Sequence, residues 1–391
     1  MKSENKIKRK LSWAIIIGLG FALSPIHNAW LTQLATVNGQ VNFFIPTFGT
    51  FLWLWCSLAF LVWNWNSIDW GNRKILVALS IIAVSIGISG LINEDSFQDR
   101  ISPLFMGISL LAVYLTCRTL GNVVFYAIIP FVILNVIIVA AIGLLNPGLS
   151  QGGLISNNCA SAGYIIFGTV VSRGKWQWLL CALAFVGLFY IGELEPVFMM
   201  FVICSYVLYR AWREGEYSYK MPLSLLPVTI AIIAWALLGY LSILYWGNGN
   251  VTELARVATG NEPLNTATVD AVTSDRFTVY LDTLRNMKLL GHGYSLSTTA
   301  GGIAHNMFLV IVQQVGILAA IAWLGVTVYC LIKTKWKYAW LCVIAMSVFD
   351  HYLWTQMTPL WWALAGVSLT STIENDHIFS SQKKCESILI K

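Results

Sequence analysis

Apolar runs about as long as a membrane helix follow one another along most of this chain, and they constrain its fold more than any other feature. A helix that crosses a bilayer needs about 20 mostly apolar residues. The chain of 391 residues is 57% hydrophobic and only 11% charged, with a mean hydropathy of +0.70. Because a soluble domain carries roughly 25% charged residues, a water-soluble enzyme is excluded. We therefore interpret the chain as an integral membrane protein.

Twelve runs meet the length requirement and predict an all-α polytopic membrane protein. They lie at 11–35, 42–63, 74–92, 101–119, 122–145, 155–172, 176–192, 196–212, 223–246, 304–332, 336–349 and 353–372. The first run follows a basic segment, as in a secretory signal, but no convincing cleavage site follows it. We therefore expect a retained first helix.

The distribution of Lys and Arg predicts which side each connection faces, because these residues accumulate in cytoplasmic loops. With a cytoplasmic N-terminus, nineteen of the 24 basic residues fall in cytoplasmic segments, including Arg118 in a predicted loop. The other five are assigned to the outer side: Arg100, Arg256, Arg276, Arg285 and Lys288. We predict that both termini are cytoplasmic and that the net charge of +6 reflects sidedness, not a nucleic-acid partner.

The predicted spans divide the chain into four regions. Nine spans occupy 1–246, an outer loop occupies 247–304, three spans occupy 305–372, and a cytoplasmic tail occupies 373–391. The outer loop is longer than a connection needs and holds four of the five outer basic residues. Four of the five histidines and eleven of the eighteen acids also map to the outer side. This clustering favours a polar cavity that opens outward, and we expect the long loop to carry the functional residues.

The eight cysteines do not indicate a disulfide framework or a zinc site. They are scattered through apolar runs and the tail, without a CxxC pair and without a cluster beside histidines. We expect neither a metal nor a cofactor.

Within the long loop, residues 274–288 predict a short amphipathic helix. Ser274 can cap its N-terminus, and Phe277, Leu281 and Leu284 recur at helical spacing and form an apolar stripe. The helix ends before a glycine-rich stretch.

Two arginines of this predicted helix are candidates for binding an anion. Arg276 and Tyr280 share a face through their i, i+4 spacing. Arg285 lies nine positions beyond Arg276, about half a turn out of phase, so the two cannot hold one anion from a straight helix. On spacing alone, a surface ion pair of Arg276 with Asp275 or Asp282 explains the residue better than an anion site does.

The stretch after the helix combines glycines with a histidine. Gly291 and Gly293 permit sharp turns and a close approach of backbone N–H groups to a ligand. No Lys-Ser/Thr pair follows them, so a nucleotide P-loop is excluded. His305 and Asn306 then stand at the start of the tenth predicted span, where a structural role at an ordinary helix start is the preferred interpretation of the pair by itself.

These residues together resemble a known signature. His305-Asn306, nine intervening residues, Gly316, two more residues and Ala319 resemble the HN-x9-G-x-x-G motif of the O-antigen ligase and polymerase superfamily. Members of this superfamily are membrane glycosyltransferases with a GT-C-like architecture. The segment 274–280 looks like the family's S-R-x-x-x-Y/W element, and 291–293 resembles its G-x-G.

The resemblance is strongest over 274–366, including Asp350 and His351 before the last span, and is topological only over the N-terminal half. It implies transfer of a glycan from a polyprenyl-pyrophosphate donor to a lipid or glycan acceptor hydroxyl, at the outer face of the inner membrane. The reaction would invert the anomeric centre and need no metal.

The resemblance also implies roles for individual residues. His305 would act as general base toward the acceptor hydroxyl, which suits a side chain with an unperturbed pKa near 6.5. Arg276 would bind the leaving pyrophosphate, because its planar fork of donors matches phosphate oxygens. Further substrate contacts are expected from Asn306, Tyr280, Gly291, Gly293, Arg256, Arg285, Lys288, Asp350 and His351, with membrane lipids as surroundings.

Two positions depart from the family pattern. Ala319 replaces the final glycine of the signature, a change that close helix packing accommodates. Where the family often has a second phosphate-binding arginine, this chain reads Gly192-Glu193-Leu194-Glu195-Pro196. A carboxylate beside a pyrophosphate repels it. Either Arg256, Arg285 or Lys288 supplies the charge, or the donor's anionic group lies elsewhere, or the chemistry differs.

Three alternatives to a ligase stay open at this point. A polymerase of the same superfamily would differ only in using the growing glycan as acceptor. A lipid-linked glycan transporter would be expected to have pseudo-symmetric halves and ionisable residues near the bilayer midplane, and neither is evident. A non-catalytic scaffold would tolerate loss of His305. For any of the enzymes, Arg118→Ala should leave the chemistry unchanged.

Overall fold

The computed structural model describes about half of the chain. The described residues are 2–23, 36–37, 40–41, 48–93, 97–145, 165, 167–168, 171, 276–293, 304, 306–334, 336–349, 353–354 and 358–370. The predicted spans at 176–192, 196–212 and 223–246 lie outside these residues, and 155–172 is covered at four positions only.

The described part is helical apart from one short antiparallel pair, β1 with β2, in which Thr36 faces Val41. Its elements are α1 (Lys2–Leu23), β1 (Thr36–Val37), β2 (Gln40–Val41), α3 (Phe48–Trp63), η1 (Trp65–Ser67), α4 (Arg73–Asn93), α5 (Phe97–Leu120), η2 (Gly121–Ala127), α6 (Ile128–Leu145), α13 (Arg276–Arg285), α14 (Met307–Gln314), α15 (Ile317–Lys333), α16 (Lys337–Phe349) and α17 (Thr358–Ser368). The all-α prediction is thus confirmed for this part, while twelve spans are not.

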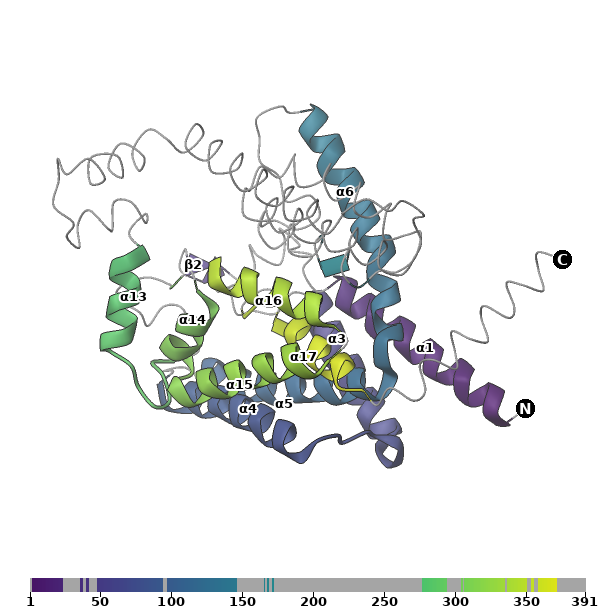
Figure 1. Cartoon of the computed structure of the whole chain (residues 1–391), viewed down its shortest axis with the longest axis horizontal. Coiled ribbons are helices and arrows are strands. Elements are labelled where there is room, and N and C mark those ends of the chain that lie inside the picture. The colour runs from purple at the N-terminus through teal and green to yellow at the C-terminus, as the bar shows by residue number, and fades with distance from the viewer. Residues whose placement is uncertain are drawn as a thin grey trace, which may run out of the picture.

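Helices α4, α5, α15 and α17 pack against one another in the described part (Figure 1). Helix α4 packs on α5 and α15, and α5 packs also on α17 and α3. Small residues let α4 and α5 approach closely, since a Cβ at Gly107 would overlap the Ala83 carbonyl and one at Gly90 would overlap the Pro103 ring. Close contact through small residues is the usual basis of helix association where lipid removes the hydrophobic driving force.

Two helical stretches are long and apolar enough to cross a membrane, Arg73–Asn93 and Pro103–Phe125. The first coincides with the predicted span 74–92, and the second overlaps the predicted span 101–119 and extends into the start of the predicted span 122–145. Taken alone they are weak support for membrane association, because a buried core helix of a soluble protein has the same length and composition.

The outward face of α15 supports a membrane environment independently of helix length. This helix buries one face on the bundle, and its solvent-directed face is apolar: Leu318, Ile321, Leu324, Val328 and Ile332. A surface helix in water carries polar residues on that face. An apolar outer face is expected where the surroundings are hydrocarbon.

The prediction of one continuous helix over 304–332 is wrong. The segment forms two helices, α14 and α15, that are separated at Val315 and Gly316. Gly316 has φ +100°, a conformation that side chains with a Cβ rarely adopt. The N–H groups of Val315 and Gly316 both donate to the Ile311 carbonyl at 2.8 and 2.9 Å, which ends the first helix. Hydropathy cannot detect such a break because both halves are equally apolar.

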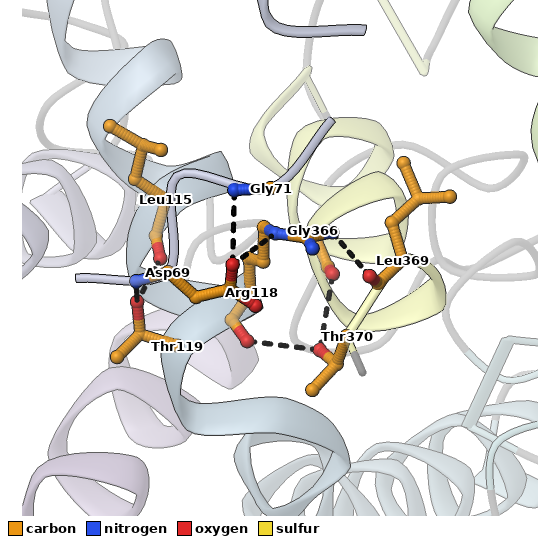
Figure 2. A network of polar contacts seen from close by, with 8 residues as sticks. All are labelled: Asp69, Gly71, Leu115, Arg118, Thr119, Gly366, Leu369 and Thr370. Atoms are coloured by element: carbon orange, nitrogen blue, oxygen red, sulfur yellow. Dashed lines mark hydrogen bonds and ion pairs between the residues drawn. The ribbon is translucent and has the colours of Figure 1, made fainter. Parts of the chain in front are cut away.

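A second correction concerns Arg118, which does not lie on a loop. It belongs to the last turn of α5, and its side chain is 9% exposed. Its Nε lies 3.2 Å from a carboxylate oxygen of Asp69, and its Nη1 donates to the Leu369 carbonyl (Figure 2). The Thr370 hydroxyl donates to the Arg118 carbonyl at 3.0 Å. We call this cluster of Asp69, Gly71, Arg118, Leu369 and Thr370 the Arg118 end.

Polar contacts also mark the opposite end of α4. Ser89 lies sixteen residues after Arg73, about 24 Å along the helix axis, and its hydroxyl donates to the Gln314 carbonyl at 2.6 Å. Trp354 also bonds to Gln314. The Gln314 end is defined by Ser89, Gly291, Gly293, Gln314 and Trp354. In the predicted topology, the segments that meet at the Arg118 end lie on the inner side, whereas Gln314 falls within the predicted span 304–332.

Candidate functional site

Helix α13 corresponds to the predicted amphipathic helix and is shorter, running over Arg276–Arg285 in place of 274–288. Its bundle-facing side holds Val279 and Tyr280, which pack against the buried core, and Thr283, which is 7% exposed. The Thr283 hydroxyl is accommodated because it donates to the Val279 carbonyl at 2.8 Å.

The predicted apolar stripe of this helix is therefore wrong in part, because Leu284 is 43% exposed. Periodicity identifies residues that share a face, but it does not decide which face meets the rest of the protein. The side chains of Phe277 and Arg276 and the capping residue Ser274 lie outside the described residues. Arg276 opens the helix, with Tyr280 one turn later and Arg285 exposed at its end.

The segment after α13 reaches the junction between α14 and α15 and bonds to it through the backbone. His292 N donates to the Gln313 carbonyl at 2.9 Å, and Gly293 N donates to the Gln314 carbonyl at 3.2 Å. In return, the Ile317 N–H, the first of α15, donates to the Lys288 carbonyl at 3.2 Å. These three bonds hold the segment 288–293 directly against the segment 313–317.

The glycines of these motifs serve that backbone contact. Gly291 has φ +72° and Gly293 has φ +125°. A Cβ at Gly291 would overlap the Gln314 carbonyl, and one at Gly316 would overlap the Leu289 carbonyl and lie 2.7 Å from Gly291 N. The N–H groups of His292 and Gly293 donate to carbonyls of α14, so these two groups are occupied by the protein itself. At Gly291 and Gly316, the nearest neighbour is the backbone of the other segment, which leaves no room for a Cβ.

Asn306 has a structural role that the sequence left open. It is the N-cap of α14, with extended backbone, and its side-chain oxygen accepts from Leu309 N at 3.2 Å. The residue before His305 is Ala304, and its backbone N–H donates to the side-chain oxygen of Gln313 at 3.5 Å. His305 itself lies outside the described residues, as do Asp350, His351, Arg256 and Glu193–Glu195, so their predicted roles stay predictions.

The sequence did not single out the residues at the centre of this region, Gln313, Gln314, Ser89 and Trp354. Trp354 Nε1 donates to Gln314 Oε1 at 2.8 Å, and both residues are about 1% exposed. Two adjacent glutamines inside an apolar run were the available signal, since polar side chains in such runs face the bundle interior.

Two candidate cations belong to the segment that leads from α13 to the junction. Lys288 and Arg285 are both exposed, and the Lys288 carbonyl is bonded to the first N–H of α15. The N-terminal end of a helix carries partial positive charge, so Lys288 adds to a positive region there. Within the described ranges, no three His, Cys, Asp or Glu residues gather where they could hold a metal ion.

No protein-family model matches this sequence, and no curated protein matches it with a significant score. The family resemblance therefore depends on the three short motifs and their order.

Proposed function

We propose that this protein is a membrane glycosyltransferase of the O-antigen ligase type. It would transfer a glycan from a polyprenyl-pyrophosphate carrier to an acceptor hydroxyl at the outer face of the inner membrane. In this proposal the chain has about twelve spans, a GT-C-like arrangement and both termini in the cytoplasm.

One observation carries the proposal. Three main-chain hydrogen bonds join the segment after α13 to the junction of α14 and α15. They fix the helix that begins with Arg276 relative to the helix that begins two residues after His305. A base and a phosphate-binding cation must be held at a defined separation in such a reaction, because orientation contributes several kcal/mol to catalysis.

The proposed reaction is a single displacement. His305 removes the proton of the acceptor hydroxyl as that oxygen bonds to the anomeric carbon of the donor. The bond from this carbon to the phosphate oxygen breaks, the configuration inverts, and polyprenyl pyrophosphate leaves with the electron pair. Arg276 stabilises the charge that develops on the leaving group.

Lys288 is the best candidate for the second phosphate-binding cation that the Glu193–Glu195 segment does not supply. It lies at the positive end of α15 and beside the G-x-G segment. Arg285 lies one turn earlier, at the end of α13.

Turnover of a lipid-linked glycan by the purified protein in detergent tests the proposal. Detergent removes the second compartment that a transporter needs, so consumption of the donor with release of polyprenyl pyrophosphate supports an enzyme. A product extended at its own sugar terminus would identify a polymerase. If the folded protein consumes no donor with either a lipid or a glycan acceptor, and His305→Ala leaves glycan attachment in cells unchanged, a scaffold replaces the enzyme.

A further inference from the structure

Gln314 connects three parts of the molecule while leaving one of its own polar groups unused. It is the last residue of α14 and is 1% exposed. Its main-chain carbonyl accepts from the Ser89 hydroxyl at 2.6 Å and from Gly293 N at 3.2 Å. Its side-chain oxygen accepts from Trp354 Nε1 at 2.8 Å.

The contact with Trp354 fixes the orientation of the Gln314 amide. An indole N–H only donates, so the amide atom facing it is the oxygen. The two N–H groups on Nε2 therefore point away from the indole. Nε2 is buried and has no hydrogen-bond partner in the structure as described.

Nε2 is one of eight buried side-chain polar atoms that make no hydrogen bond among the described residues, and its residue is the one that bonds through the main chain to Gly293. The large majority of buried polar side-chain atoms in proteins are hydrogen bonded, so an unpaired donor at this place calls for an explanation. Nε2 is a donor only, so it selects an oxygen acceptor and rejects a cation. Acceptors of that kind on the proposed substrate are phosphate oxygens and sugar hydroxyls.

The surroundings of Gln314 are the segments to which the proposed reaction assigns its chemistry. Gly291 and Gly293 contact its carbonyl group, and the neighbouring Gln313 side chain bonds to Ala304, the residue before His305. Trp354 follows Asp350 and His351 by a few residues. Lys288 lies at the same junction.

We propose that Gln314 is a ligand-binding residue whose Nε2 donates a hydrogen bond to an oxygen of the donor substrate, with Trp354 holding the amide in the donating orientation. The identity of that substrate rests on the proposed function, whereas the donor character of the site does not.

The test measures binding of two probes to the full-length protein in nanodiscs. One probe is polyprenyl pyrophosphate, and the other is the same carrier bearing one N-acetylglucosamine. Gln314→Met keeps the length of the side chain and removes the donor. We expect roughly ten- to a hundredfold weaker binding if the bond is to a charged phosphate oxygen and about three- to tenfold if it is to a hydroxyl.

Thr327→Val is the matched control, because the Thr327 hydroxyl accepts from Trp361 Nε1 at 3.1 Å elsewhere in the bundle. It removes the same kind of tryptophan bond and should leave both affinities unchanged. Trp354→Phe keeps the Gln314 donor but frees its orientation, and a loss of about threefold is expected. Gln314→Glu, which retains an oxygen for Trp354, replaces Gln314→Met if that variant does not fold.

Equal loss for both probes identifies a phosphate oxygen, and loss for the sugar-bearing probe alone identifies a hydroxyl. Unchanged binding of both probes to a folded Gln314 variant overturns the proposal, and so does an equal loss in Thr327→Val. Turnover is measured separately. A wild-type protein that turns over donor while Gln314→Met binds normally refutes this inference alone. A protein with Gln314-dependent binding and no turnover refutes the glycosyltransferase alone.

Discussion

The two ends of the described bundle differ in how their buried polar groups are paired. At the Arg118 end, a cation meets a carboxylate and a helix-terminal carbonyl, and the cluster joins the connection before α4 to the ends of α5 and α17. At the Gln314 end, the five residues that define it carry no charge, the glycines bring backbones into contact, and Gln314 Nε2 is buried without a hydrogen bond. Arg118 Nε is also buried without a hydrogen bond, but it lies 3.2 Å from the Asp69 carboxylate, which supplies the opposite charge. The Arg118 end is therefore suited to hold helices together, whereas the neutral donor of Gln314 has no counterpart among the described residues.

The largest effect on function is expected from His305→Ala. Loss of a general base lowers turnover by roughly 10²- to 10⁴-fold, with little change in the melting temperature. Rates of donor consumption in detergent provide the measurement. His377→Ala, in the predicted cytoplasmic tail, is the control of the same residue type. If the His305→Ala protein is fully active, His305 is not the general base, and the proposed reaction does not take place at the Gln314 end.

The next effect is structural and concerns Gly316→Ala. The added Cβ would overlap the Leu289 carbonyl in a backbone with φ +100°. We expect the free energy of unfolding to fall by at least about 2 kcal/mol, together with loss of turnover. Gly325→Ala, in the same helix, has no atom within 4 Å of the added Cβ and should be neutral or stabilising by up to about 1 kcal/mol. Thermal unfolding in detergent compares the two, and equal effects would contradict the role of Gly316.

The Arg118 end should affect stability without affecting chemistry. Arg118→Ala leaves Asp69, which is 34% exposed, and the Leu369 carbonyl without their partner. We expect a loss of about 1–3 kcal/mol, at the lower part of the range for buried ion pairs because Asp69 is partly solvated. Turnover per folded molecule should stay unchanged. A fall in turnover per folded molecule would show that the two ends are coupled, and it would contradict a purely structural role of the Arg118 end.

The smallest effects on function are expected from replacing the exposed cations Lys288 and Arg285. Lys288→Ala should raise the KM for the lipid-linked donor about three- to tenfold with kcat nearly unchanged, since one exposed phosphate contact contributes about 1 kcal/mol. Arg285→Ala should change KM less, because it lies farther along the chain from the start of α15. Steady-state kinetics at low ionic strength measure both. The reverse order would assign the second phosphate contact to Arg285.

Two helices of the N-terminal half, α4 and α5, were predictable from the sequence. The predicted spans at 74–92 and 101–119 match α4 and α5 within a few residues, since long apolar runs have few alternatives to a helix. A helix in the region of α13 was also predictable, because apolar residues recur at helical spacing between 277 and 284. The break at Gly316 was not predictable, because it depends on the backbone of 289–291, which lies about 25 residues earlier.

The sequence by itself determined the apolar, helical character of the chain and the order of its motifs, because both follow from composition and spacing along one dimension. Only the tertiary structure decided that Arg118 is buried against Asp69 and Leu369, and that Gly291 and Gly316 face each other. It also decided that Gln314 gives its oxygen to Trp354 and keeps its nitrogen free of described partners. Such choices depend on which distant segments meet, and hydrogen bonds are directional contacts that no periodicity along the chain encodes.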